Sequence, residues 1–533
     1  MDTPFHDRIP TPPAMATGSK LPASSTLLPE SDADASTTRS LVTDSIATGV
    51  IFALVLTVGQ RGIGFLRGLL FCRYMSDQQL GQWSLVWSFL MMLIPFAMLG
   101  LPGCFGRYTE HYKNKGQLGY FLSRIGLVST LLTLAASLAM FIFPESFSRM
   151  IFRSPDQVWV IYAMAASVLM VSISNFMTSL MESLRQVRVV TLMRFITGIL
   201  FATLGVGLVL LMDDAAIGAT IGFGLSSLIG AIPALYILFR YRDTLRNTGE
   251  YLNHSTMWKR LAPFAMWMWA SNFFNNCFEL SDRYMLLYCS PVSADAAQGF
   301  VGQYHSGRQI PLLLVSLSFM LGGVLIPYMS AHWEKGRKKE ARQLLIWSLK
   351  LLSLGFTFAG IGVQLFAPYI FDTILEGRYD EGLSVLPLTL VYCIWFGLTS
   401  VAQNYLWVVE KGKWIALSVG SGLIVNLVLN WLLIPSMGVN GAVIATATSN
   451  ALLLAMIYWF NGRHGCRIGP GVIYCSSFPL VLLLPVMFSI PLTLIMVFVG
   501  WKTTVVFSDG EKTEIGEMAG KALQKFGIGK SDS

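Results

Sequence analysis

The sequence predicts an all-α polytopic membrane protein in which two six-helix lobes are related as a parallel repeat. Three observations predict this fold class: an apolar, charge-poor composition, many segments of membrane-spanning length, and an internal repeat. Of the 533 residues, 54% are hydrophobic and 13% are charged, and the mean hydropathy is +0.58. A soluble globular chain has about 25% charged residues, so the missing charge indicates surface that faces lipid.

The apolar segments set the number of helices. Crossing the hydrocarbon core takes about 20 apolar residues in a helix, and twelve such segments precede residue 461. The segments of the first lobe are 47–73, 82–104, 119–143, 158–181, 189–212 and 214–240. Those of the second lobe are 261–288, 300–330, 344–370, 383–409, 414–435 and 439–460.

A further hydrophobic stretch, 472–500, follows the twelve segments. It is interrupted by Pro479, Pro485 and Pro491. Because two full crossings need about 40 residues, we expect one kinked span here, with two short spans as the alternative. The fold therefore has one or two helices beyond the two lobes.

The composition along the chain divides it into six parts. The first part is rich in Ser, Thr, Pro, Ala and Asp without an apolar run, which is typical of a disordered tail. In the last part Ile515, Met518, Ala519 and Leu523 have helical spacing, which predicts a short amphipathic helix. The parts are a disordered tail (1–43), an N-lobe (44–243), a cytoplasmic linker (244–260), a C-lobe (261–460), an extra hydrophobic segment (461–500) and a polar tail (501–533).

The basic residues of the loops predict the orientation. If the N-terminus is cytoplasmic, the inside loops carry 19 Lys and Arg residues, whereas the outside loops carry only Arg149, Arg153 and Arg378. This positive-inside bias favours a multi-pass protein of the inner (plasma) membrane with a cytoplasmic N-terminus. The net charge of +8 is spread over these loops, so it predicts no nucleic-acid partner.

An internal repeat relates the two lobes. Residues 188–226 align without gaps onto 411–449, which matches Gly218-Ala219 to Gly441-Ala442. The sequence Leu80-Gly81-Gln82-Trp83 is matched in the same way by Val301-Gly302-Gln303-Tyr304. Because each copy contains an even number of spans, both copies have the same orientation in the membrane. Parallel repeats of this kind place a substrate site between the lobes near mid-membrane.

The cysteines and loops carry no sign of catalysis. The seven cysteines are never spaced as CxxC, so we expect packing residues and neither a metal site nor a cofactor. An enzyme acting on a membrane lipid would usually need a folded domain outside the membrane, and the predicted outside loops are too short for one. The sequence therefore predicts a protein that is not an enzyme and has no catalytic residues.

Several motifs resemble a known family. They are ILEGRYDEGLSVLPLTL, VEKGKW and LIVNLVLNWLLIPSMGVNGAVIATATSN between Ile374 and Asn450, and LSDRYMLLYCSP with GQYHSG before them. They resemble the polysaccharide-transport and oligosaccharide-flippase branch of the multidrug, oligosaccharidyl-lipid and polysaccharide exporter superfamily. The resemblance covers residues 44 to 460. It implies a two-lobed, V-shaped bundle like that of the multidrug and toxic compound extrusion (MATE) transporters.

The same resemblance implies a function and partners. The substrate would be an undecaprenyl-pyrophosphate-linked oligosaccharide, flipped by alternating access for lipopolysaccharide (O-antigen), capsule or exopolysaccharide synthesis. Membrane lipids, and a polysaccharide polymerase or glycosyltransferases of the same pathway, would be its partners. Two alternatives share the architecture: a multidrug or cation antiporter, and a lipid II flippase.

Charged residues within the spans are the candidate site. A charge inside a span costs about 2.5 to 3.5 kcal/mol, so those that persist usually face a cavity or a partner. In one interpretation they are buried structural ions, with Arg67 and Arg308 extending toward headgroups. In the other, guanidinium groups bind the pyrophosphate in a bidentate manner, and nearby acids and a histidine form an ion or proton site. The candidate substrate-binding residues are Arg61, Arg67, Arg283, Arg308 and Asn275, and the candidate coupling residues are Glu279, Asp282 and His305.

Overall fold

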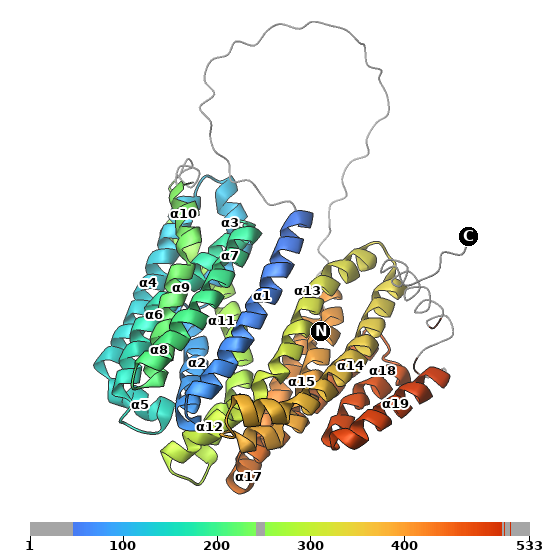
Figure 1. Ribbon diagram of the computed structural model, residues 1–533. Helices are drawn as coiled ribbons and strands as arrows, with labels where there is room; N and C mark the ends of the chain where they lie inside the picture. Colours follow the sequence, from blue (N-terminus) through green and yellow to red (C-terminus); the bar gives the residue numbers. More distant parts are fainter. Residues whose placement is uncertain (1–45, 241–250, 504–505, 507–511, 513–533) are drawn as a thin grey trace, which may run out of the picture. The chain divides into compact units, whose positions relative to one another are not determined.

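The computed structural model describes residues 46–240 and 251–503, together with Val506 and Lys512. All of them belong to one compact unit, Leu41–Ser533. The predicted tail 1–43, residues 244–250 of the predicted linker 244–260 and the predicted amphipathic helix at Ile515–Leu523 lie outside the described residues. The rest of the linker is described, and from His254 it forms the start of a helix. The described part is helical and contains no strand, which confirms the predicted all-α class (Figure 1).

The helices coincide with the predicted apolar segments. Up to residue 240 the elements are α1 (Ile46–Tyr74), α2 (Asp77–Ala97), η1 (Leu101–Cys104), α3 (Phe105–Asn114), α4 (Leu118–Ile142), α5 (Pro144–Phe152), α6 (Val158–Ser183), α7 (Val187–Leu200), η2 (Phe201–Gly205), α8 (Val206–Leu211), α9 (Ala215–Gly230) and α10 (Ile232–Arg240). From residue 254 they are α11 (His254–Cys289), α12 (Ala294–Gln309), α13 (Pro311–Glu334), α14 (Lys338–Tyr369), η3 (Ile370–Ile374), α15 (Asp380–Ala402), α16 (Asn404–Val408), α17 (Gly412–Arg463), α18 (Pro470–Ser477), η4 (Phe478–Leu483) and α19 (Val486–Lys502).

Local capping determines where several helices begin. Ser76 starts α2 with a capping box, in which its hydroxyl accepts from the Gln79 backbone N–H at 3.2 Å and the Gln79 side chain accepts from the Ser76 N–H at 3.1 Å. Asp214 caps α9 by accepting from the backbone of Ala216 at 2.9 Å. Gly438, with φ 53° and ψ −127°, divides α17 into two helices. This position favours glycine because its backbone is left-handed.

The helices have the length and surface of a membrane protein. In the described part of the chain, nine helical stretches are long and apolar enough to cross a bilayer, and α17 contains two of the predicted segments. Many large apolar side chains lie on the outer surface, which would be unfavourable in water. On α4, for example, Leu127, Leu131 and Phe141 are 61%, 56% and 61% exposed. Lipid is the solvent that suits such a surface.

The C-terminal hydrophobic segment differs from our prediction. Instead of one kinked span over 472–500, the chain forms two helical pieces, α18–η4 and α19, which are separated at Leu484 and Pro485. The Tyr474 hydroxyl donates to the Met496 carbonyl at 3.1 Å, so the second piece folds back against the first. The expectation of one span was wrong because Pro485 lacks the N–H that a continuous helix needs at that point.

The glycines of the internal repeat occupy matching environments. A Cβ on Gly218 would lie 2.6 Å from the Leu208 carbonyl oxygen, and a Cβ on Gly441 would lie 2.6 Å from that of Leu433. Gly81 of α2 and Gly302 of α12 lie against each other, and a Cβ on either would overlap the backbone of the other helix. The two glycines therefore allow α2 and α12, from the two halves of the chain, to cross in direct backbone contact.

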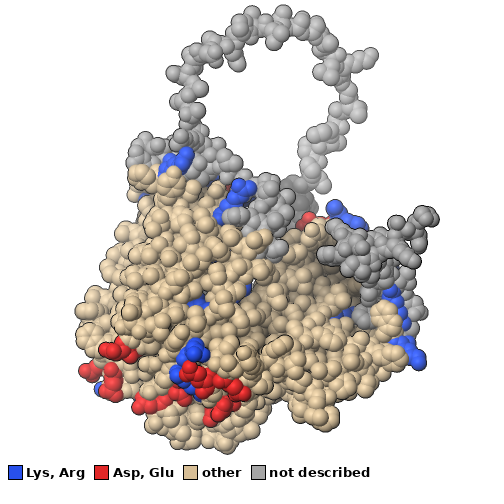
Figure 2. Space-filling view, in the orientation of Figure 1, with Lys and Arg blue, Asp and Glu red and all other residues tan. Residues whose placement is uncertain are grey.

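Most acidic residues of the visible surface gather toward one end of the bundle, where some basic residues lie among them (Figure 2). Figure 2 shows Asp and Glu gathered along the lower edge of the visible surface, where α5 and α12 lie in Figure 1. We call the end at which α1 ends and α2 begins the outer end, after the predicted orientation. α11 packs against α2, α12 and α17, and α12 packs against α2, α15 and α1. These helices position the candidate site.

Candidate functional site

Three arginines from three helices surround one histidine. Arg308 follows His305 by one turn on α12, and Arg67 of α1 precedes Gly68, which lies against the side chain of Gln309, a partner of His305. Arg283 of α11 donates to Ser88 of α2, one turn from the Ser84 that contacts His305. We call Arg67, Arg283, Arg308 and His305 the arginine cluster. His305 itself is held from two sides, since its Nδ1 lies 3.1 Å from Ser84 Oγ of α2 and its Nε2 lies 2.5 Å from Gln309 Nε2.

Neighbouring side chains fix the guanidinium groups. Arg283 is 5% exposed, and its Nη1 donates to Ser88 Oγ of α2 at 2.7 Å. The Arg67 guanidinium lies 4.1 Å from the ring centroid of Phe201, and that of Arg308 lies 5.3 Å from the ring centroid of Tyr304. Both aromatic contacts are cation–π interactions, which hold a positive charge in place without neutralising it.

Asp282 lies next to the arginine cluster but in a surrounding of neutral hydrogen-bond donors. Its carboxylate accepts from Tyr304 at 2.5 Å, Asn426 at 3.0 Å, Asn430 at 2.9 Å and Thr446 at 2.7 Å. We call Asp282 and these four donors the Asp282 cage. Asp282 is 4% exposed, and hydrogen bonds to the charged form are what stabilise a carboxylate in such a place. The cage joins α11, α12 and both parts of α17.

Tyr304 connects the two groups. Its hydroxyl belongs to the Asp282 cage, while its ring lies beneath the guanidinium of Arg308. Tyr304 therefore contacts both groups at once, the Asp282 carboxylate with its hydroxyl and the Arg308 guanidinium with its ring.

The structure brings together only part of the predicted site. Arg67, Arg283, Arg308 and His305 form one cluster. Arg61, six residues before Arg67, lies on an exposed face of α1, because a helix turns by about 240° over six residues. The side chains of Asn275 and Glu279 lie outside the described residues.

The interpretation of the intramembrane charges as buried structural ions agrees with the structure only in part, and the interpretation as a pyrophosphate and ion site stays a prediction. Asp282 and Arg283 are hydrogen-bonded to neighbours, as expected of buried ions. Arg67 and Arg308, however, stack on aromatic rings instead of extending toward headgroups. The amide of Asn276 donates to the Met91 carbonyl at 3.1 Å and so joins α11 to α2.

Sequence reasoning missed several residues of the site. They are small or neutral polar side chains, which carry no charge to mark them in an apolar helix: Ser84, Ser88, Tyr304, Asn426, Asn430 and Thr446. One signal was present, since Asn426 and Asn430 are four residues apart in an otherwise apolar helix and therefore share a face. Two amides on one buried face indicate a polar partner on another helix.

The membrane-spanning helices, together with the family match and the similar proteins given below, identify a polytopic membrane transporter of the multidrug, oligosaccharidyl-lipid and polysaccharide superfamily. Within it, the chain belongs to the polysaccharide biosynthesis protein family, whose model matches residues 46–333. This result confirms the family that the motifs resemble.

Relatives and solved structures agree with this assignment. The chain is 22% identical to the lipid II flippase MurJ of Bacillus subtilis over 405 residues, covering 69% of this chain and 73% of that protein. It is 25% identical to the uncharacterized membrane protein YabM of Bacillus subtilis over 239 residues, which are 43% of this chain and less than half (44%) of that protein.

Two solved structures have the same fold. One is the lipid II flippase MurJ in an inward closed conformation, with a TM-score of 0.64, 13% identity, and coverage of 85% of this chain and 99% of that chain. The other is an inward-facing multidrug resistance MATE family transporter, with a TM-score of 0.63, 12% identity, and coverage of 78% and 97%.

Proposed function

We propose that this protein flips a lipid-linked oligosaccharide, carried on undecaprenyl pyrophosphate, across the inner membrane by alternating access. The observation that carries the proposal is the arginine cluster: Arg67, Arg283 and Arg308 converge on His305 from three helices. The lipopolysaccharide, capsule or exopolysaccharide pathways would use such a product. The family model, which describes polysaccharide biosynthesis proteins, supports this substrate class.

The chemistry of the arginine cluster suits a pyrophosphate. A guanidinium is planar and offers two parallel N–H donors, which match the paired oxygens of a phosphate group. A low-dielectric surrounding strengthens these charge interactions compared with water. Positive charge from several helices would therefore hold the anionic part of the lipid while its chains remain in the bilayer.

The Asp282 cage supports a role in coupling, with His305 and Glu279 as the other proposed coupling residues. A proton or small cation that entered the cage would compete with hydrogen bonds from Tyr304, Asn426, Asn430 and Thr446. These bonds hold α11, α12 and α17 together. Occupation of the cage would therefore change how the helices of the second half pack, which is what coupling requires.

The wider proposal follows from the predicted organisation. The N-lobe (44–243) and the C-lobe (261–460) would rock about the site between them, and the N-terminus would be cytoplasmic. Transport of this kind needs no covalent chemistry, so we propose that the protein is not an enzyme. Glycosyltransferases of the pathway would supply the substrate, and a polysaccharide polymerase would use it on the other side.

Two second candidates have specific support. A lipid II flippase is favoured by the relative and the structure of that name, and its substrate would also be a pyrophosphate lipid. A cation antiporter is favoured by three aromatic rings between α2 and α11: Trp269 stacks on Phe273 at 5.6 Å, and Phe96 lies 5.5 Å from Trp269. Aromatic faces attract organic cations.

A reconstituted assay tests the proposal. The purified chain in proteoliposomes would be given a fluorescent polyprenyl-pyrophosphate-linked sugar, and the label that leaves the outer leaflet would be followed with a membrane-impermeant quencher. Arg283→Lys and Arg308→Lys keep the charge but lose the planar fork, so we expect at least about tenfold slower transport, equivalent to about 1.4 kcal/mol.

The matched control is Arg149→Lys. Arg149 lies on α5 with a side chain that is 68% exposed, and it pairs only weakly with Glu145 at 3.7 Å. We expect wild-type transport from this variant. Normal transport by both cluster variants, at normal incorporation into the liposomes, would refute the arginine role. Transport of ethidium in place of the pyrophosphate lipid would favour the antiporter.

A further inference from the structure

We propose that the segment from Ile374 to Tyr379 is a latch that holds the two halves of the transporter together at the outer end. It binds the end of α1 and the turn into α2, and it must release them before the outer side can open. The inference rests on the alternating access proposed above. It assigns the closing function to particular residues, namely Arg73 and Met75 in the first half and Ile374, Glu376, Arg378 and Tyr379 in the second.

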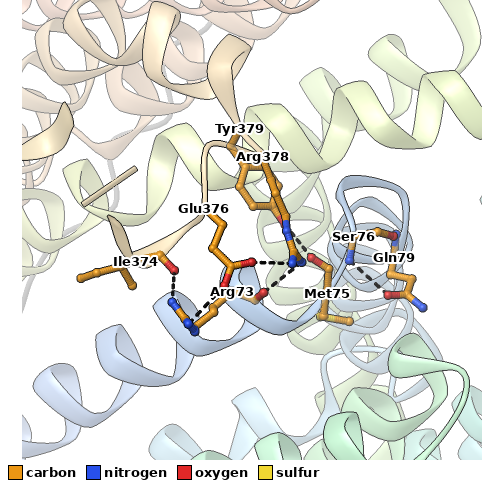
Figure 3. Close-up of polar contacts among 8 residues, drawn as sticks. All are labelled: Arg73, Met75, Ser76, Gln79, Ile374, Glu376, Arg378 and Tyr379. Carbon is orange, nitrogen blue, oxygen red and sulfur yellow. Dashed lines mark hydrogen bonds and ion pairs between the residues drawn. The ribbon is translucent and has the colours of Figure 1, made fainter. Parts of the chain in front are cut away.

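Charged contacts form the exposed part of the latch (Figure 3). Arg73 Nη2 lies 3.2 Å from Glu376 Oε1, and Arg378 Nη2 lies 2.6 Å from Glu376 Oε2. The Glu376 carboxylate therefore bridges an arginine of α1 and an arginine of its own segment. Arg378 Nη1 also donates to the Arg73 backbone carbonyl at 3.1 Å, so the two arginines are linked twice.

Backbone and buried contacts form the inner part of the latch. Arg73 Nη1 donates to the Ile374 carbonyl at 2.8 Å. Ile374 is the last residue of η3, so its carbonyl has no partner within the helix and needs one beyond it. The fully buried Tyr379 donates its hydroxyl to the Met75 carbonyl at 3.0 Å. Each of these bonds crosses from one half of the chain to the other, about 300 residues apart.

The backbone of the segment also indicates a conformation held by its contacts. Glu376 has a left-handed backbone with φ 58°, followed by Gly377 with φ 67°. A glycine adopts this conformation readily, but a glutamate does so only when its surroundings favour it. Here the carboxylate would lose its place between the two arginines if the backbone relaxed. The turn is thus stabilised by the same contacts that close the outer end.

The exposure of the ion pairs suits a contact that opens repeatedly. The side chains of Arg73, Glu376 and Arg378 are 36%, 45% and 44% exposed. Exposed pairs stabilise weakly because water and salt screen them. The arrangement therefore combines a buried Tyr379 contact, which aligns the halves, with exposed charges that exchange readily for water.

A native cysteine reports whether the latch is open. Cys72 directly precedes Arg73 on α1, is 1% exposed, and lies one turn before Met75, whose carbonyl accepts from Tyr379. The experiment adds a membrane-impermeant maleimide to the outside of intact cells and measures the labelling rate of the Cys72 peptide by mass spectrometry. The full chain is used, and folding is checked by fluorescence-detected size exclusion.

We expect Glu376→Gln to raise the Cys72 labelling rate about threefold, because it removes the charge that joins the arginines. Tyr379→Phe, which leaves the Met75 carbonyl without its buried donor, should raise it by about fivefold or more. The matched control is Glu145→Gln. Glu145 is an exposed carboxylate at the same end of the molecule, and it pairs with Arg149 within α5, not with a residue of the other half. It should label at the wild-type rate.

The possible outcomes separate this inference from the proposed substrate. Wild-type labelling of both folded latch variants would overturn the latch, whatever the protein transports. An equal increase in the Glu145→Gln control would also overturn it, since the effect would then come from surface charge alone. Faster Cys72 labelling in a protein that moves no pyrophosphate lipid would support the latch and contradict the proposed function.

Discussion

The arginine cluster and the Asp282 cage are neighbours, but the cage surrounds one charge with neutral donors, whereas the cluster gathers several charges of the same sign. In the cage, one carboxylate accepts hydrogen bonds from four neutral side chains, so its charge is stabilised locally. In the cluster, three guanidinium groups converge on a histidine, and positive charges that share a small volume repel one another. The cage therefore joins helices of the second half through neutral donors, whereas the proposed role of the cluster is to bind an anion.

Removal of the Asp282 carboxylate should have the largest effect on stability. Asp282→Ala leaves four buried donors without their acceptor, and hydrogen bonds in membrane proteins average about 0.6 kcal/mol each, with stranded buried groups costing more. We expect a loss of about 2 kcal/mol or more, seen as a lower melting temperature in detergent. An unchanged melting temperature would show that the cage contributes little to folding.

Asp282→Asn sharpens that experiment. The amide retains one oxygen to accept a hydrogen bond, so the loss of stability should be smaller than that of Asp282→Ala. A larger loss would mean that the negative charge itself matters more than the number of hydrogen bonds.

Replacement of Tyr304 tests whether the two regions are separable. Tyr304→Phe removes the hydroxyl that donates to Asp282 at 2.5 Å but retains the ring beneath Arg308. We expect a loss of about 1 kcal/mol of stability, measured by thermal unfolding, with binding of the pyrophosphate lipid within about twofold of wild type because the cluster keeps its charges. A loss of binding as large as that of Arg308→Lys would show that cage and cluster act as one unit.

The smallest effect should come from removing Ser88, the side chain that holds Arg283 of the arginine cluster in place. Ser88→Ala removes the hydroxyl that accepts from Arg283 at 2.7 Å. Because one such bond contributes about 0.6 kcal/mol, we expect transport of the fluorescent pyrophosphate lipid to slow by about two- to threefold, with the melting temperature unchanged. Transport faster than wild type would mean that Ser88 restrains Arg283 instead of positioning it.

The repeat was visible in the sequence because it depends on backbone geometry. Gly218 and Gly441 each lie near the start of a helix that passes close to a backbone carbonyl at the end of the preceding helix, where a side chain would not fit. Gly81 and Gly302 lie where α2 and α12 cross. Such positions exclude a side chain in both copies, so they survive as a matching pattern. The C-terminal segment had no second copy for comparison, and its division at Pro485 was mispredicted.

The sequence by itself determined the helices, the family and the residue types of the site. Helix length and hydropathy are local properties, and the cost of burying charge already marked Arg67, Asp282, Arg283, His305 and Arg308 as the residues to examine. Only the tertiary structure decided which of them meet. Arg61 and Arg67 share one helix, yet only Arg67 reaches the cluster.

The physical reason is that helix rotation and packing are set by contacts between distant segments. Asp282 meets Asn426, Asn430 and Thr446, which are more than 140 residues away in the chain. Arg73 meets Glu376 because the outer ends of two helices in different halves are brought together. A hydropathy pattern gives the position of a helix in the chain and its length, but the direction in which each polar side chain points, and what it finds there, depends on the neighbours that the fold supplies.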